Sequence, residues 1–107
     1  MNLPLTLRKL LTIVCEASLE PDLVRDLAEL GARGYTVTEA RGRGAHGLRD
    51  GSWGAVANIR VEVLCDEATV EAIVETLHHR YYAHYGMVMF VTEAAVLRPE
   101  KFRGGAA

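Results

Sequence analysis

The sequence of 107 residues has little cysteine, little proline and no long apolar segment. Its two cysteines, Cys15 and Cys65, are too few for a disulfide framework, and neither lies in a CxxC motif or a zinc-like Cys/His pattern. The longest apolar runs, residues 10–15 and 87–91, are far shorter than the ~20 residues that cross a bilayer. These absences favour a reduced intracellular protein that does not span a membrane.

The charges are also nearly balanced, with 12 basic and 14 acidic residues and a net charge of −2. A general nucleic-acid binder normally has a broad basic excess, so we expect no nucleic acid as a partner. The apolar stretch after Lys9 is followed by Glu16 and Glu20 and not by a small-residue cleavage site. We therefore expect no signal peptide and a cytoplasmic location. The length suits one domain, over residues 1–107.

The period of the apolar residues changes several times along the chain. Alternating or dense β-branched and aliphatic segments predict strands, and apolar stripes with a spacing of three and four predict helices. Pro21 suits the first turn of one helix, Gly31 or Gly34 its end, and Asp66 the cap of the second. The expected order is β-α-β-β-α-β, with strands at residues 7–16, 35–39, 58–65 and 87–97, a first helix within 18–34 and a second at 66–85.

Two βαβ halves with right-handed crossovers fold as a ferredoxin-like α+β sandwich, with both helices on one face of the sheet. The first strand is apolar on both sides, since Leu10 and Val14 alternate with Leu11 and Ile13. We therefore expect the second sheet face to be buried between subunits. In this sheet the first and third strands are antiparallel neighbours, which places the two cysteines at opposite ends and argues against a disulfide.

The segment between the second and third strands, residues 40–56, holds five of the ten glycines and no regular apolar period. Gly42-Arg43-Gly44 lies within it, with Arg41 before and Arg49 after. Glycines let consecutive main-chain N–H groups turn toward one anion, and arginine binds phosphate oxygens in a bidentate way. The segment is therefore either a phosphate-binding loop or a solvated hairpin loop with incidental arginines.

Other candidate groups give weaker signals. His78, His79 and His84 include no pair at a spacing of four, so they do not share a helix face and we expect no metal site. No Ser-His-Asp or Cys-His set follows from the spacing, so we expect no enzyme. Trp53 is either part of a contact surface or folded back on its own subunit.

Three segments in order carry a specific resemblance. GYTVTEARGRG at 34–44 and ANIRVEVL at 57–64 resemble the strands that enter and leave the T-loop of PII signalling proteins, and YYAHYGMVMF at 81–90 is similar to a divergent PII-like branch. That branch holds the carboxysome-associated PII-like proteins and the SbtB-like regulators of bicarbonate transport. The resemblance spans about residues 7–97.

The resemblance implies a PII-like homotrimer with adenine-nucleotide sites in the clefts between subunits. It also implies a T-loop at about 40–56 and a mobile C-terminal tail at about 98–107. Thr36 matches a position beside the base of the nucleotide. The loop residues match positions near its phosphates, and residues 86–88 match a shortened B-loop. The matching site residues are Thr36, Gly42, Arg43, Gly44, Arg49, Gly86, Met87, Val88, Arg98 and Lys101.

The resemblance further implies ADP or AMP as ligand, with ATP as an alternative, together with bicarbonate and without a metal. The partner would be a bicarbonate transporter or a carboxysome-associated protein that contacts the T-loop. Nucleotide binding would order this arginine-rich loop and so expose or hide a surface that carries Trp53. Two alternatives stay open: a slow ATP or ADP hydrolase at the same cleft, and a structural or metal-tolerance trimer that binds no nucleotide.

Overall fold

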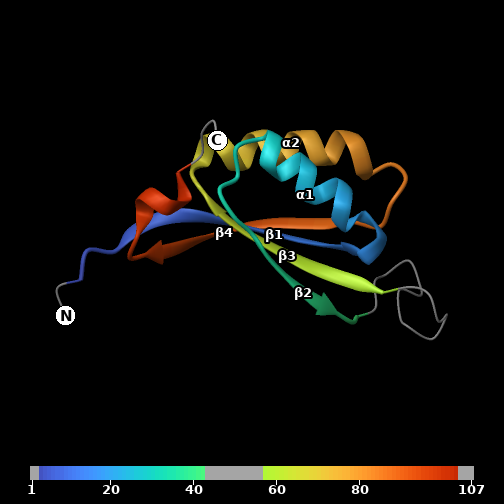
Figure 1. Cartoon of the computed structure of the whole chain (residues 1–107), viewed down its shortest axis with the longest axis horizontal. Coiled ribbons are helices and arrows are strands. Elements are labelled where there is room, and N and C mark those ends of the chain that lie inside the picture. Colours follow the sequence, from blue (N-terminus) through green and yellow to red (C-terminus); the bar gives the residue numbers. More distant parts are fainter. Residues whose placement is uncertain (1–2, 43–56, 104–107) are drawn as a thin grey trace.

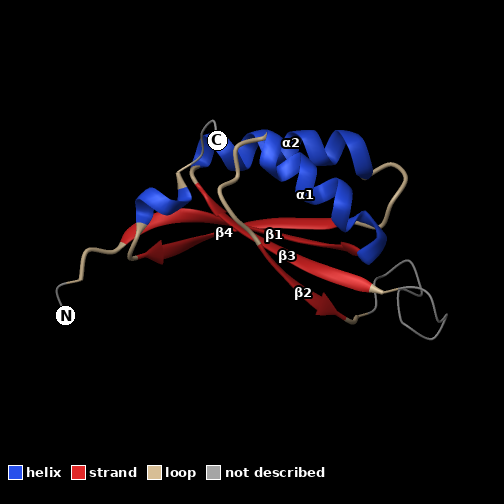
Figure 2. Cartoon of the chain, viewed as in Figure 1, coloured by secondary structure: helices blue, strands red, loops and turns tan. Residues whose placement is uncertain are grey.

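A computed structural model describes residues 3–42 and 57–103 of the chain. The described residues form one four-stranded sheet in the order β2-β3-β1-β4, in which every neighbouring pair is antiparallel. The two α-helices lie side by side over one face of the sheet (Figures 1 and 2). The main elements are β1 (Thr6–Glu16), α1 (Glu20–Glu29), β2 (Thr36–Ala40), β3 (Asn58–Cys65), α2 (Glu67–Tyr81) and β4 (Val88–Val96). The ferredoxin-like βαββαβ fold is thus confirmed.

Local sequence signals explain where the helices begin and end. The Asp66 carboxylate accepts a hydrogen bond from the main-chain N–H of Thr69 at 2.9 Å and so caps α2. Pro21 lies in the first turn of α1, where its missing N–H costs nothing. Gly31 has a φ of 94°, the left-handed conformation that commonly follows a helix, and the expectation for the end of α1 is confirmed.

Two segments near the C-terminus differ from the expectation. The second helix ends at Tyr81 and not near residue 85, because the next residues turn back toward the start of β4. The polar tail is more regular than its composition suggests, since Pro99–Phe102 forms a short 3-10 helix, η3. Another short 3-10 helix, Ala17–Leu19, joins β1 to α1.

The core fills the space between the helices and the face of the sheet that they cover. Alternate residues of β1 and β3 point into it and meet the apolar stripes of both helices. Its buried apolar members are Leu11, Ile13, Cys15, Leu19, Leu23, Leu27, Ile59, Val61, Val63, Cys65, Val70, Ile73, Leu77, Tyr81 and Met87. Cys15 lies opposite Ile59 and Cys65 opposite Lys9, so the cysteines lie at opposite ends of this ladder as expected, and they form no disulfide with each other.

The opposite face of the sheet has no helix over it. Thr12 lies in its middle and is buried by its neighbours alone, since it pairs with Glu62 on one side and Phe90 on the other. Along β4, Val88 is 58% and Phe90 45% exposed on this face. We name this side of the sheet the open face. It presents apolar side chains to solvent, as expected for a surface that another subunit covers.

Candidate functional site

A pocket of about 470 Å³ lies on the open face. Residues from the sheet form its floor, and the connection before β2 and the C-terminal segment form its walls. The lining residues are Leu10, Arg33, Gly34, Tyr35, Thr36, Glu62, Leu64, Ala94, Lys101 and Phe102. An apolar floor with a few polar groups is typical of a small-ligand site.

Strand register explains the floor of the pocket. Leu10 lies opposite Leu64 in the β1–β3 ladder, and Thr36 lies opposite Glu62 in the β2–β3 ladder. Glu62 is held from one side by Arg60, whose Nη2 lies 3.6 Å from Oε2. The pocket therefore offers one carboxylate and one threonine hydroxyl beside an aliphatic surface, a set that suits a planar ring with hydrogen-bond donors.

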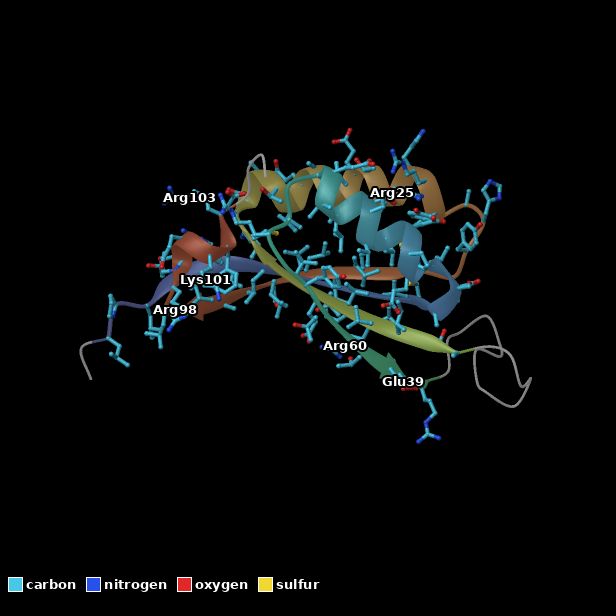
Figure 3. All side chains as sticks on the ribbon, in the orientation of Figure 1. Arg25, Glu39, Arg60, Arg98, Lys101 and Arg103 are labelled. Carbon is cyan, nitrogen blue, oxygen red and sulfur yellow. The ribbon has the colours of Figure 1, made fainter. Side chains whose placement is uncertain are left out.

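The C-terminal segment forms a wall of the pocket because two arginines hold its main chain. Nε of Arg8 donates to the carbonyl oxygen of Pro99 at 3.3 Å, and Nε of Arg33 donates to that of Arg103 at 2.6 Å. These bonds place η3 beside the sheet, so that Lys101 and Phe102 line the pocket. In Figure 3, Arg98, Lys101 and Arg103 lie together at one end of the molecule, and Glu39 lies toward the other.

A second group of candidate residues lies in the connection between α2 and β4. The main-chain N–H groups of His84 and Tyr85 both donate to the carbonyl oxygen of Tyr81, at 3.1 and 2.9 Å. Within the described part of the chain, those of Gly86 and Met87 donate to no acceptor. Two successive main-chain donors without a partner can bind an anion.

The structure brings only some of the predicted residues together. Thr36 and Lys101 both line the pocket. Arg98 lies just before η3 and does not line the pocket. The segment 86–88 belongs instead to the opposite edge of the sheet, because β2 and β4 are its two outer strands. Three inter-strand spacings of about 4.8 Å separate these strands, roughly 14 Å in all. A single chain thus presents two separate groups of candidate residues.

The remaining predicted residues lie in or next to the segment before β3. Gly42 is exposed, and a side chain at its position would meet nothing within 4 Å. Arg43, Gly44 and Arg49 lie outside the described residues, as do Trp53 and most of the predicted T-loop. The loop was predicted to begin at residue 40, but in the structure Ala40 is still the last residue of β2.

Most of the pocket lining was not predicted from the sequence. Leu10, Leu64 and Ala94 look like ordinary strand residues, and only the strand order brings them together. Glu62 gives a weak signal, because it is a charged residue in a strand whose alternate residues are apolar. Tyr35 gives none, because an aromatic residue is typical of a strand and only the structure shows that it is 46% exposed.

The helix layer contains a buried charged group that joins α1 to α2. Asp26 is 2% exposed and accepts hydrogen bonds from Arg80 and from the Tyr81 hydroxyl, the latter at 2.6 Å. Burial and this hydrogen bond to Asp26 raise the pKa of Tyr81, so its hydroxyl stays a donor throughout the physiological range. The cluster fixes the last turn of α2 on α1.

Two further classes of site are absent from the described ranges, 3–42 and 57–103. No three His, Cys, Asp or Glu side chains come close enough there to share a metal ion. None of the helices in these ranges combines the length and the apolar character that a bilayer crossing requires.

The fold and the pocket together define a small ferredoxin-like protein with a pocket of ligand size, and comparison with known proteins makes the class specific. The profile of the family described as nitrogen regulatory protein P-II matches residues 8–101. A PII-like signalling protein from Thermus thermophilus is 41% identical, with a TM-score of 0.79 over 92% of this chain and 97% of that one. The chain therefore belongs to the PII family.

Two further solved structures refine this result. CPII, a nitrogen regulatory PII-like protein from Thiomonas intermedia, was solved with ADP, AMP and bicarbonate. It is 27% identical, with a TM-score of 0.86 over 95% of this chain and 99% of CPII. The GlnK–ATP complex of B. subtilis is 16% identical, with a TM-score of 0.63 over 82% of this chain and 84% of GlnK, and shows the fold alone. The resemblance to CPII-type PII-like signalling proteins is thus confirmed.

Proposed function

We propose that the protein is a homotrimeric, non-enzymatic, cytoplasmic regulator that binds ADP or AMP, together with bicarbonate, in clefts between its subunits. Binding orders the T-loop, which then acts on a bicarbonate transporter or a carboxysome-associated protein. CPII supports the ligand assignment, because its structure was solved with ADP, AMP and bicarbonate.

One observation carries the proposal: the candidate residues fall into two groups on opposite edges of one sheet. Thr36 lines the pocket from the β2 edge, although the pocket floor itself extends across the sheet as far as Ala94. The main-chain donors of Gly86 and Met87, which have no acceptor in the described part of the chain, lie just before β4 at the other edge. A neighbouring copy whose β4 edge approaches this β2 edge would join the groups into one site. The exposed apolar side chains of the open face give such an assembly a driving force.

The two groups also differ in the ligand chemistry that they suit. The pocket floor offers the Glu62 carboxylate, the Thr36 hydroxyl and the aliphatic surface of Leu10 and Leu64, which suits the amino group and rings of adenine. The main-chain donors suit an oxyanion, as do Lys101 and the arginines of the predicted T-loop. In this arrangement the nucleotide spans the subunit boundary, with its base in the pocket and its phosphates toward the donors.

Calorimetric titration with AMP, ADP and ATP, each with and without bicarbonate, tests the proposal. Two variants of one strand sharpen it, since Thr36 lines the pocket and Thr38, on the same face of β2, does not. We expect Thr36→Val to weaken ADP binding by about 1 kcal/mol, the usual value of one neutral hydrogen bond, and Thr38→Val to leave it unchanged.

Other outcomes separate the alternatives. No heat with any nucleotide would contradict the proposal and favour a structural trimer. Sustained phosphate release from ATP or ADP, lost in Arg49→Ala, would favour a hydrolase. Sedimentation as a single chain at micromolar concentration would contradict a site that is shared between subunits.

A further inference from the structure

Tyr82 follows the last residue of α2 and reaches across to the start of β4. Its hydroxyl oxygen accepts a hydrogen bond from the main-chain N–H of Met89 at 2.9 Å. Its ring packs on the side chain of His78, with ring centroids 4.7 Å apart. The side chain is 37% exposed, so it is not part of the core. The hydrogen bond from Met89 to Tyr82 thus closes the turn between α2 and β4 at its C-terminal end.

The N-terminal end of the same turn is also fixed. Arg80 and Tyr81, the two residues before Tyr82, both donate to the buried carboxylate of Asp26 on α1. The main chain from Tyr81 to Met89 is therefore held at its start by the contacts of Arg80 and Tyr81 with α1, and at its end by the Tyr82 hydroxyl. Only a few conformations of the residues between satisfy both constraints.

The turn carries the two main-chain N–H groups, of Gly86 and Met87, that have no acceptor in the described part of the chain. We propose that Tyr82 is a positioning residue for a phosphate group of the ligand, because its bond to Met89 fixes the path of these two donors. The inference rests on the proposed function. It adds a residue that need not touch the nucleotide and acts through the main chain.

Tyr85 offers a matched control on the same turn. It is 41% exposed, close to the value for Tyr82, and its ring packs edge-on against Tyr81 at 5.8 Å. Its hydroxyl makes no hydrogen bond to any residue in the described ranges. Replacement of either tyrosine by phenylalanine removes one hydroxyl and keeps the ring, but only Tyr82→Phe releases the N–H of Met89.

The experiment compares ADP with adenosine, which has the same base and ribose but no phosphate. Calorimetry gives the Kd of ADP, and competition against ADP gives that of adenosine. For Tyr82→Phe we expect the Kd of ADP to rise about 3- to 10-fold, that of adenosine to stay within about 2-fold, and amide hydrogen exchange at Met89 to accelerate. For Tyr85→Phe we expect none of these changes.

A merely structural role for Tyr82 would weaken ADP and adenosine equally, and that result would overturn the inference. So would an ADP affinity equal to that of the wild type. A loss confined to titrations that contain bicarbonate would assign the donors to bicarbonate and overturn the assignment to phosphate. If the wild-type protein binds ADP and only the effect of Tyr82→Phe is missing, the proposed function stands. If the wild type does not bind ADP, both fail.

Discussion

The two faces of the sheet use the same strands in different ways. In β1, Leu11 and Ile13 point toward the helices and are fully buried, and Leu10 and Thr12 point to the open face. The middle of the helix-covered face holds buried aliphatic side chains and the two cysteines, with charged residues such as Lys9 and Glu93 only toward its rim. The open face mixes threonines, charges and exposed apolar residues throughout. The first face buries the core of the chain, and the second holds the pocket and exposes apolar side chains to solvent.

The largest effect should come from the covered face. Ile73 on α2 is fully buried in the core. We expect Ile73→Ala to lower the free energy of unfolding by about 3–4 kcal/mol, through lost burial and the cavity that remains. Urea denaturation followed by circular dichroism measures this loss. A loss below about 1 kcal/mol would mean that the helix layer is not the main source of stability.

The second largest effect should come from high pH, which lowers the free energy of unfolding through a buried group of the covered face. Burial, with a contribution from the Asp66 charge, raises the pKa of the Cys65 thiol to about 11 from 9.0. Between these values the folded state keeps a proton that the unfolded state loses, so the free energy of unfolding falls as pH rises. The slope approaches about 1.4 kcal/mol per pH unit, and the stabilisation is complete below about pH 9.

Denaturation curves between about pH 8 and 10 measure this effect. Cys65→Ala removes the thiol and should show a flatter dependence over the same interval. An equal slope in the variant and the wild type would contradict the assignment. Above about pH 10 the raised pKa of Tyr81 adds a further loss of the same sign, which Tyr81→Phe removes.

The smallest effect on one chain should come from the open face. Phe90 is already 45% exposed, so Phe90→Ala should lower the stability of a dissociated chain by at most about 1 kcal/mol. If the open face is buried between subunits, the same change weakens assembly, and sedimentation should show more free chains at a given concentration. Unchanged assembly would argue against an interface on the open face.

Several elements of this protein follow from the sequence with little ambiguity. The alternation of NIRVEVLC predicts β3, and Asp66 with the apolar stripe after it predicts the start of α2. Two glycines limit the end of α1 to two positions, of which the structure uses Gly31. Local propensity and the burial of one face act over a few residues, so the pattern records them directly. The order of these elements then leaves few possible topologies.

Only the tertiary structure decided which distant residues share a site. Leu10, Glu62 and Phe102 meet at one pocket because antiparallel register and a C-terminal segment held by arginines bring them together. The hydroxyl of Tyr82 meets Met89 because α2 ends earlier than its composition suggests. Contacts of this kind depend on strand order and on the exact end of a helix, and no local period in the sequence specifies either.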